Sequence, residues 1–492
     1  MNLLKQFLAL IILTASFQGY AQDNVFLDRT FWKENPSIET IDQKIKEGNN
    51  PSQLNGYSFD AVVYAIIAEV DNATLKYLMS KEGNSANKLT HDGRTYIFWA
   101  AYKGNVELMH HLLEKGAKTD IIDDHGNTIL NFAASSGQQN TAVYDLCLEN
   151  GANLEEDLNH NGANALLLVA PSDKDFKLIN YFTSKGLDIK STDANGDGIF
   201  NYVARTGNIE LLNKLIDKGV EGNNNAFIFA SQGTRGKTNG IEFFKYLENL
   251  GLNPNASTKD GKTPLHALAS RSDDVILLNY FIEKDVDVNQ PDSDGNTAFM
   301  NAVSRNNIET IAFLLKQVKD INAVNKKGES ALALATQYNS SEVVQFLIKN
   351  NADVSVIDAN GNNLSYYLIN SYNSKKAEDF KSKLKLLQSE GFDVATIQKN
   401  GNTLFHLALD KNDLELLKLV NTFKLDVNAK NKEGMSPLHK AAMEAKNDAI
   451  IKYLLSIGAN KNAVTEFDET AYDLASENEI LKQNNISIDF LK

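Results

Sequence analysis

Apolar positions along the chain recur in a phrase of twelve residues that begins with a glycine. About two residues after this glycine stands Thr or Ser, a run of apolar and small residues follows, and Gly or Asn closes several copies. The clearest copies are GRTYIFWAAYKG from Gly93, GNTILNFAASSG from Gly126, GKTPLHALASRS from Gly261, GNTAFMNAVSRN from Gly295, GNTLFHLALDKN from Gly401 and GMSPLHKAAMEA from Gly434. Self-similarity at one period predicts a stack of small units rather than one globule.

Twelve positions anchor these units, at a mean spacing of about 34 residues. They are Gly93, Gly126, Gly162, Gly196, Gly222, Gly261, Gly295, Gly328, Gly361, Gly401, Gly434, and Asp468 in the same role. One spacing, after Gly196, is only 26 residues, and extra residues stand at 234–240 and 372–377. Insertions in a stack of repeats are expected in loops between helices.

The sequence pattern of each unit predicts two helices. A polar turn such as Asp92-Gly93 leads into a short helix that begins after Thr or Ser, because a hydroxyl can accept a hydrogen bond from the first turn. The second helix, as in 106–113 or 209–216, has apolar residues at i, i+3, i+4 and i+7 and therefore one buried stripe. A pair such as Gly116-Ala117 ends it.

The unit resembles the ankyrin repeat, in which a β-turn finger precedes two antiparallel helices. The family phrase D-x-x-G-x-T-P-L-H-x-A-A-x-x-G is matched best after Gly261 (TPLH) and Gly434 (SPLH), then after Gly401 (TLFH). Other copies lose Pro or His but keep their length and glycines. The resemblance implies an all-α ankyrin-repeat solenoid of about 12–14 repeats. The array is expected over 93–476, degenerate units over 22–92 and a cap over 477–492.

The first 21 residues differ from the array. Lys5 precedes an apolar run at 7–17, and Gly19-Tyr20-Ala21 has the small-x-small pattern of a cleavage site, so we interpret 1–21 as a signal peptide cleaved between Ala21 and Gln22. The protein is then expected to be exported, periplasmic or secreted, and the signal style resembles that of a Gram-negative bacterial protein. Later segments are too short and polar to span a bilayer, so no membrane insertion is expected after cleavage.

Charge and cysteine content narrow the function. The formal net charge of −14 argues against general nucleic-acid binding, which needs clustered Lys and Arg. The single cysteine, Cys147, cannot form an internal disulfide, and we interpret it as a small buried side chain rather than a reactive thiol.

Three motifs imitate ligand sites. SQGTRGKT at 231–238 is one residue short of a phosphate-binding loop, but the repeat register makes the preceding apolar run a first helix. DANGDG at 193–198 and DLNHNG at 157–162 begin like calcium loops, yet position twelve is Ala204 or Leu168 where Glu is needed. Turn chemistry at a finger explains their Asp, Asn and Gly.

Six of the eight histidines fall into two groups. The resemblance implies a structural, finger-linking role for the TPLH slot, which holds His266, His406 and His439. Three others, His91, His125 and His160, stand at consecutive fingertips. Neighbouring units stack about 10 Å apart, whereas zinc needs ligands about 2 Å from one ion, so we expect no metal and no cofactor. A metal or small-ligand site at these histidines stays as an alternative.

No pattern supports catalysis: the sequence has no nucleophile elbow, no zinc-helix pair and no dinucleotide glycine motif after a strand. We therefore expect a non-enzymatic protein. A solenoid offers an extended concave surface, and we expect a protein–protein interaction scaffold that acts as a monomer. An alternative is an inhibitor or immunity protein for one secreted enzyme or toxin.

The resemblance also implies where a partner would bind, since family contacts come from residues beside the finger glycine and at the end of the first helix. These positions are His91, Arg94, Trp99, Tyr102, Lys103, His125, Lys259, Lys262, Arg271, Arg305, Lys326, Lys327 and Tyr338. From Lys259 to Tyr338 the candidate positions hold six basic and three acidic residues, which suggests a partner with an acidic segment, while ordinary solvated charges are the alternative. Trp99 either anchors the partner or packs between repeats.

Overall fold

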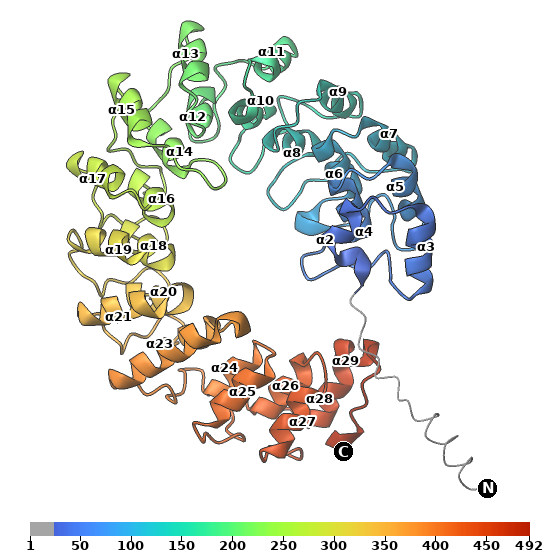
Figure 1. Cartoon of the computed structure of the whole chain (residues 1–492), viewed down its shortest axis with the longest axis vertical. Helices are drawn as coiled ribbons and strands as arrows, with labels where there is room; N and C mark the ends of the chain where they lie inside the picture. The colour runs from blue at the N-terminus through green and yellow to red at the C-terminus, as the bar shows by residue number, and fades with distance from the viewer. Residues whose placement is uncertain (1–23) are drawn as a thin grey trace. The chain divides into compact units, whose positions relative to one another are not determined.

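The computed structural model describes residues 24–492, so the predicted signal peptide and its cleavage site lie outside the described residues. Within 24–492 the regular structure is helical, with only isolated β-bridges beside the helices (Figure 1). Thirteen helix pairs, from α4/α5 to α28/α29, follow two N-terminal helices in this described part. The prediction of an all-α solenoid of about 12–14 repeats is confirmed.

The chain divides into two compact units, and the division falls within the short spacing between Gly196 and Gly222. Unit 1 holds the helices before Gly222, and unit 2 holds Asn223–Lys492 together with Arg205–Gly207. In each unit the first helix of a pair is here called inner and the second outer.

Unit 1 begins with α2 (Arg29–Lys33) and α3 (Ile38–Lys46). Its inner helices are α4 (Ala61–Ile67), α6 (Tyr96–Lys103), α8 (Ile129–Ser135), α10 (Ala165–Val169) and α12 (Ile199–Ala204). Its outer helices are α5 (Asn72–Met79), α7 (Val106–Glu114), α9 (Thr141–Glu149), α11 (Lys177–Ser184) and α13 (Ile209–Asp217).

Unit 2 repeats the same plan eight times. Its inner helices are α14 (Ala226–Gln232), α16 (Pro264–Arg271), α18 (Ala298–Arg305), α20 (Ala331–Tyr338), α22 (Leu364–Asn370), α24 (Leu404–Leu409), α26 (Pro437–Glu444) and α28 (Ala471–Glu477). Its outer helices are α15 (Ile241–Asn249), α17 (Val275–Glu283), α19 (Ile308–Leu315), α21 (Ser341–Lys349), α23 (Ala377–Ser389), α25 (Leu414–Asn421), α27 (Ala449–Ser456) and α29 (Glu479–Gln483).

Inner helices form the core because both of their sides are covered. Successive inner helices such as α16, α18 and α20 pack against one another, and each also packs against its own outer helix (Figure 1). Six successive residues of α20, Ala331 to Thr336, are buried, whereas α13 buries only one stripe, Leu211, Leu212 and Leu215. Helices this short are marginal alone, so packing between repeats stabilises them.

Helix starts follow the predicted capping. Thr128, Thr297 and Ser330 each accept a hydrogen bond from a first-turn N–H of an inner helix, at 3.3, 3.3 and 3.2 Å. Many outer helices use Asn or Asp instead, as at Asn208, whose side chain accepts from Leu211 N at 3.0 Å.

Many fingers are closed by an Asp or Asn three residues before the finger glycine, as at Asp193. Asp193 Oδ1 accepts the N–H groups of Asn195 and Asp197 at 2.8 and 3.0 Å, and Gly196 then adopts φ +83°. The interpretation of DANGDG as turn chemistry is therefore confirmed. The prediction of Gly222 as an anchor glycine is wrong. Gly222 lacks a positive φ, and the Phe200 ring occupies the space where a Cβ would stand, so it is no finger glycine.

Consecutive fingers are joined by backbone hydrogen bonds. The N–H of Lys326 donates to Asp294 O at 2.8 Å, and that of Ala359 donates to Lys327 O at 2.7 Å. Unit 1 has the same link from Asp124 to Asp92, at 3.0 Å. In unit 2 such links join each finger to the next from Asp260 to Lys432.

The segment that imitates a phosphate-binding loop is a turn between two helices. Its preceding apolar run is α14, as the repeat register predicted, and Thr234 and Lys237 pair across a tight turn before α15. No helix among residues 24–492 is long and apolar enough to cross a membrane.

Candidate partner-binding surface

The TPLH histidines link adjacent fingers, as the family resemblance implied. His406 Nδ1 accepts the Thr403 N–H at 3.2 Å, and its Nε2 lies 3.0 Å from Met435 O in the next finger. A ring that accepts at Nδ1 and faces a carbonyl at Nε2 carries its proton on Nε2 and is neutral. Burial lowers the pKa of this imidazole, and His266 and His439 show the same arrangement.

Arg94 does not face outward, which corrects its assignment as an exposed contact residue. Its side chain is 8% exposed, and its guanidinium binds Asp123 at 2.8 Å and Asp92 at 3.1 Å. The same guanidinium lies 4.1 Å from the centre of the Phe132 ring. Arg94 therefore fastens two fingers together.

Trp99 is placed by packing. It is 6% exposed, its indole N–H donates to Thr90 Oγ1 at 2.9 Å, and its ring lies 5.7 Å from Phe59 and 5.8 Å from Phe132. Of the two roles predicted for Trp99, this geometry favours packing between repeats over anchoring a partner.

The remaining candidates in unit 1 are partly engaged. His91 stacks on Phe59 at 4.4 Å, and His125 Nε2 lies 3.1 Å from Asp92 Oδ2. Lys103 pairs with Glu69, while Tyr102 is 37% exposed. His91 and His125 each contact the preceding repeat, and the described residues contain no group of three or more His, Cys, Asp or Glu side chains able to hold a metal.

Unit 2 exposes every candidate predicted there. These residues are Lys259, Lys262, Arg271, Arg305, Lys326, Lys327 and Tyr338, the last 60% exposed. Within residues 24–492, no acidic side chain lies at ion-pair distance from Lys262, Arg305, Lys326 or Lys327. Arg271 donates to the Gln232 carbonyl and is thereby held at the end of α16. Uncompensated cations thus occupy neighbouring fingers and inner-helix ends.

Exposed aliphatic residues accompany these cations, and sequence reasoning missed them. Val324, Ile357 and Ile397 each stand four residues before a finger glycine and are 51%, 62% and 60% exposed. The next residue turns inward, as Asn325 and Gln398 do, so an exposed aliphatic side chain alternates with a buried polar one. An apolar residue four positions before three successive glycines, Gly328, Gly361 and Gly401, was the signal that could have found this row.

A hollow lies between two of these aliphatic residues. Ile357 and Ile397 line a recess of about 520 Å³, together with Phe392, Thr396 and Lys399. We call the exposed residues Lys262, Val324, Lys326, Lys327, Arg305, Tyr338, Ile357, Ile397 and Lys399 the finger surface of unit 2.

Cys147 shows no reactive environment. Its side chain is buried, and desolvation raises the pKa of the thiol to about 12. Since the thiolate is the nucleophile, the prediction of a structural cysteine fits this geometry.

Comparisons with known proteins agree with the fold. A model of ankyrin repeats (3 copies) matches residues 62–157, 227–325, 269–358, 299–377 and 371–465. These matches cover more than half of the chain, and the chain belongs to the ankyrin-repeat family.

Several characterised proteins share part of the array. The chain is 29% identical over 90 residues to human protein phosphatase 1 regulatory subunit 27, covering 18% of this chain and 58% of that protein. It is 34% identical over 94 residues to rat protein phosphatase 1 regulatory subunit 12A, covering 18% and 9%. It is 28% identical over 131 residues to the phosphocholine transferase AnkX of Legionella pneumophila, covering 26% and 14%. The chain thus spans less than two thirds of each of these relatives.

Ankyrin repeats generally serve as protein–protein interaction modules, and the fold is typically non-enzymatic. Two of these relatives are named as regulatory subunits, whereas AnkX is named as an enzyme and is matched over a small part of its length.

Proposed function

We propose that the protein is a non-enzymatic scaffold that binds a protein partner through the finger surface of unit 2. The observation that carries this proposal is the row of uncompensated cations beside exposed aliphatic side chains on consecutive fingers. Membership in the ankyrin-repeat family and the regulatory-subunit names of two relatives support it.

The chemistry of the surface indicates the partner segment. Lys326 and Lys327 follow Val324 on one finger, and Lys399 follows Ile397 two fingers further on. The lysine ammonium groups attract carboxylates of a partner and raise the rate of encounter, and burial of the aliphatic side chains strengthens the binding. The partner segment is therefore acidic and carries aliphatic residues.

Rigid spacing favours an extended partner segment. Because backbone hydrogen bonds join the fingers, the lysines and aliphatic residues are held at a fixed repeat. Because this row is formed before the partner binds, binding does not carry the entropy cost of ordering the finger surface.

Site-specific crosslinking tests where the partner binds. A photo-crosslinking amino acid at Tyr338, 60% exposed at the end of an inner helix, is expected to capture the partner. The matched position is Ile276, 72% exposed on outer helix α17 of the same unit. Excess acidic peptide should suppress the product at Tyr338. Equal capture from Ile276, or no competition, would contradict the proposal.

We also propose that the partner is met after export. The apolar run and the Gly19-Tyr20-Ala21 pattern support this localisation. The mass of the protein purified from its native compartment tests it, because a mature chain beginning at Gln22 is expected. A chain that keeps its first 21 residues would contradict export by cleavage.

A further inference from the structure

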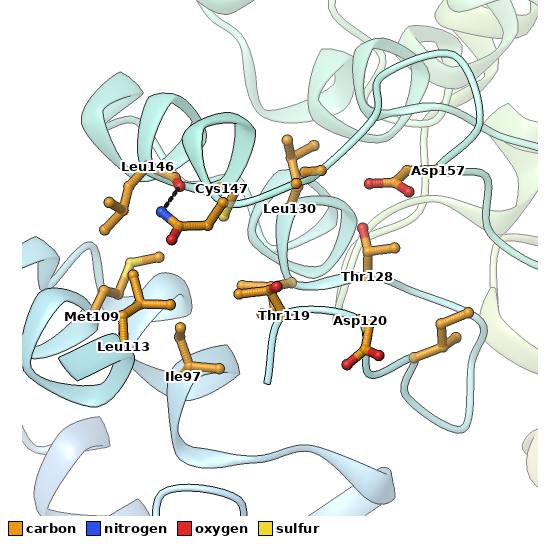
Figure 2. Close-up of a pocket in the computed structure, with 15 residues that line it drawn as sticks. Ile97, Met109, Leu113, Thr119, Asp120, Thr128, Leu130, Leu146, Cys147 and Asp157 are labelled. Atoms are coloured by element: carbon orange, nitrogen blue, oxygen red, sulfur yellow. Dashed lines mark hydrogen bonds between the residues drawn. The ribbon is translucent and has the colours of Figure 1, made fainter. Parts of the chain in front are cut away.

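Unit 1 contains a pocket that the proposed partner surface does not use. It has a volume of about 230 Å³ and lies between α7, α9 and the loops that precede Gly126 and Gly162 (Figure 2). An engineered cavity of about 150 Å³ holds benzene, so this volume suits a molecule of about ten non-hydrogen atoms.

Substitutions at fixed repeat positions open this pocket. The corresponding place in unit 2 holds only about 120 Å³, and Phe299 and Ile321 line it. Leu130 stands where unit 2 has Phe299, and Gly151 stands where unit 2 has Val318, so two lining side chains are smaller in unit 1.

The pocket is apolar on one side and acidic on the other. Met109, Leu113 and Leu146 lie on the side away from Asp157 and Asp120 (Figure 2). No Lys, Arg or His is among the residues that line it. An anionic ligand would therefore meet carboxylates without any compensating cation.

Asp157 is peculiar to this repeat. It stands five residues before Gly162, a position that is neutral at every other finger except the one that has Lys88. Its counterpart in the unit 2 cavity is Ala323. The Asp157 carboxylate accepts the Asn153 N–H at 3.1 Å, and no basic side chain among the described residues lies at ion-pair distance from it. Burial raises the pKa of this carboxyl, as expected for a group that lacks a cation.

We propose that this pocket of unit 1 binds a small amphiphilic amine, with the ammonium group on Asp157 and a compact apolar body against Met109, Leu113 and Leu146. An ammonium supplies the positive charge that the lining lacks. The apolar body is transferred from water into contact with apolar side chains, which is favourable. Binding is non-covalent, because the Cys147 thiol in the lining is not ionised at neutral pH.

Phenethylamine is a suitable probe, and 3-phenylpropanoate and 2-phenylethanol are its anionic and neutral counterparts. Calorimetry on the full chain is expected to show phenethylamine binding, about tenfold weaker binding of the alcohol and none of the acid. Both tryptophans, Trp32 and Trp99, lie in unit 1, so fluorescence-detected melting reports whether the probe stabilises that unit.

Asp157→Asn is the decisive variant, because an amide keeps the size of the side chain and can still accept the Asn153 N–H. The D157N variant is expected to bind phenethylamine about tenfold more weakly or worse, whereas Asp217→Asn on α13 of the same unit leaves the affinity unchanged. Equal affinity of the D157N variant, or equal affinity of the acid and the amine, would overturn the proposal. If D157N fails to fold, the comparison of the three ligands on the unaltered protein decides.

Discussion

His406 and Met435 join two repeats of unit 2 through one hydrogen bond, in which His406 Nε2 donates to the Met435 carbonyl at 3.0 Å. The opposite ring nitrogen accepts the Thr403 N–H, so one side chain caps its own helix and holds the next finger. Local capping and stacking of repeats are therefore coupled, and the finger surface inherits its fixed spacing from such links.

Replacing His406 should loosen this link. In His406→Ala, the Thr403 N–H and the Met435 carbonyl lose their buried partner, and the expected cost is about 2–3 kcal/mol. Hydrogen exchange measured by mass spectrometry should rise in α24 and around Met435. The matched variant is His110→Ala, whose histidine is exposed on α7, and it should leave both exchange and stability unchanged. An equal effect of the two variants would show that the bond contributes nothing.

The same histidines predict how stability depends on pH. Burial lowers the pKa of His266, His406 and His439 in the folded state. The unfolded chain, with histidine pKa near 6.5, then binds more protons as the pH falls. Unit 2 should keep its stability above about pH 7 and lose it progressively below about pH 6.5.

Urea midpoints at pH 7.5, 6.5 and 5.5 measure this dependence. Each histidine contributes at most about 1.4 kcal/mol per pH unit, so His406→Gln should flatten the slope by that limit or less. A slope identical in wild type and variant, or stability that rises on acidification, would contradict the neutral assignment.

Because neighbouring fingers approach closely, alanine should destabilise unit 2 more at Gly328 than at Gly251. Gly328 has φ +76°, and a Cβ there would lie 2.5 Å from Ala359 N, whereas Gly251 has φ +87° and open space. Alanine at either position costs about 1 kcal/mol for its left-handed backbone. Gly328→Ala should cost at least about 1 kcal/mol more, since the finger hydrogen bond from Ala359 to Lys327 must move. Equal unfolding free energies for both variants would argue against tight finger stacking.

Replacing Arg94 should strongly destabilise unit 1. Arg94→Gln leaves the buried Asp123 carboxylate without its cation, and we expect a loss of about 3 kcal/mol. Tryptophan fluorescence during urea unfolding measures it, with Lys118→Gln, an exposed lysine of the same unit, as control. Adding Asp123→Asn should restore part of the loss. No recovery in the double variant would mean that the pair is not the cause.

Much of the fold was predictable because repetition reveals it. The glycine phrase placed the inner helices and the fingers, and the TPLH slot gave the roles of His266, His406 and His439. The register also reduced the phosphate-loop and calcium-loop imitations to turns, which Asp193 and α14 confirm.

Side-chain direction was harder to predict, because it depends on a partner one repeat away. Arg94 and Lys262 both follow a finger glycine, yet Arg94 turns inward to Asp123, 29 positions along the chain, and Lys262 is exposed. Gly222 fits the spacing but lacks the turn. The pocket of unit 1 depends on the combined sizes of Leu130 and Gly151, which no single motif encodes.

The affinity of the finger surface for an acidic, aliphatic peptide tests the central claim most directly. Fluorescence anisotropy would compare wild type with K262E/R305E/K327E and with K316E/K349E/K385E, a triple of exposed lysines on or beside the outer helices with the same change in charge. We predict that the first variant binds at least about tenfold more weakly and loses its salt dependence, while the second binds nearly as well as wild type. Equal weakening by both variants would reduce the effect to net charge and contradict a binding site on the finger surface.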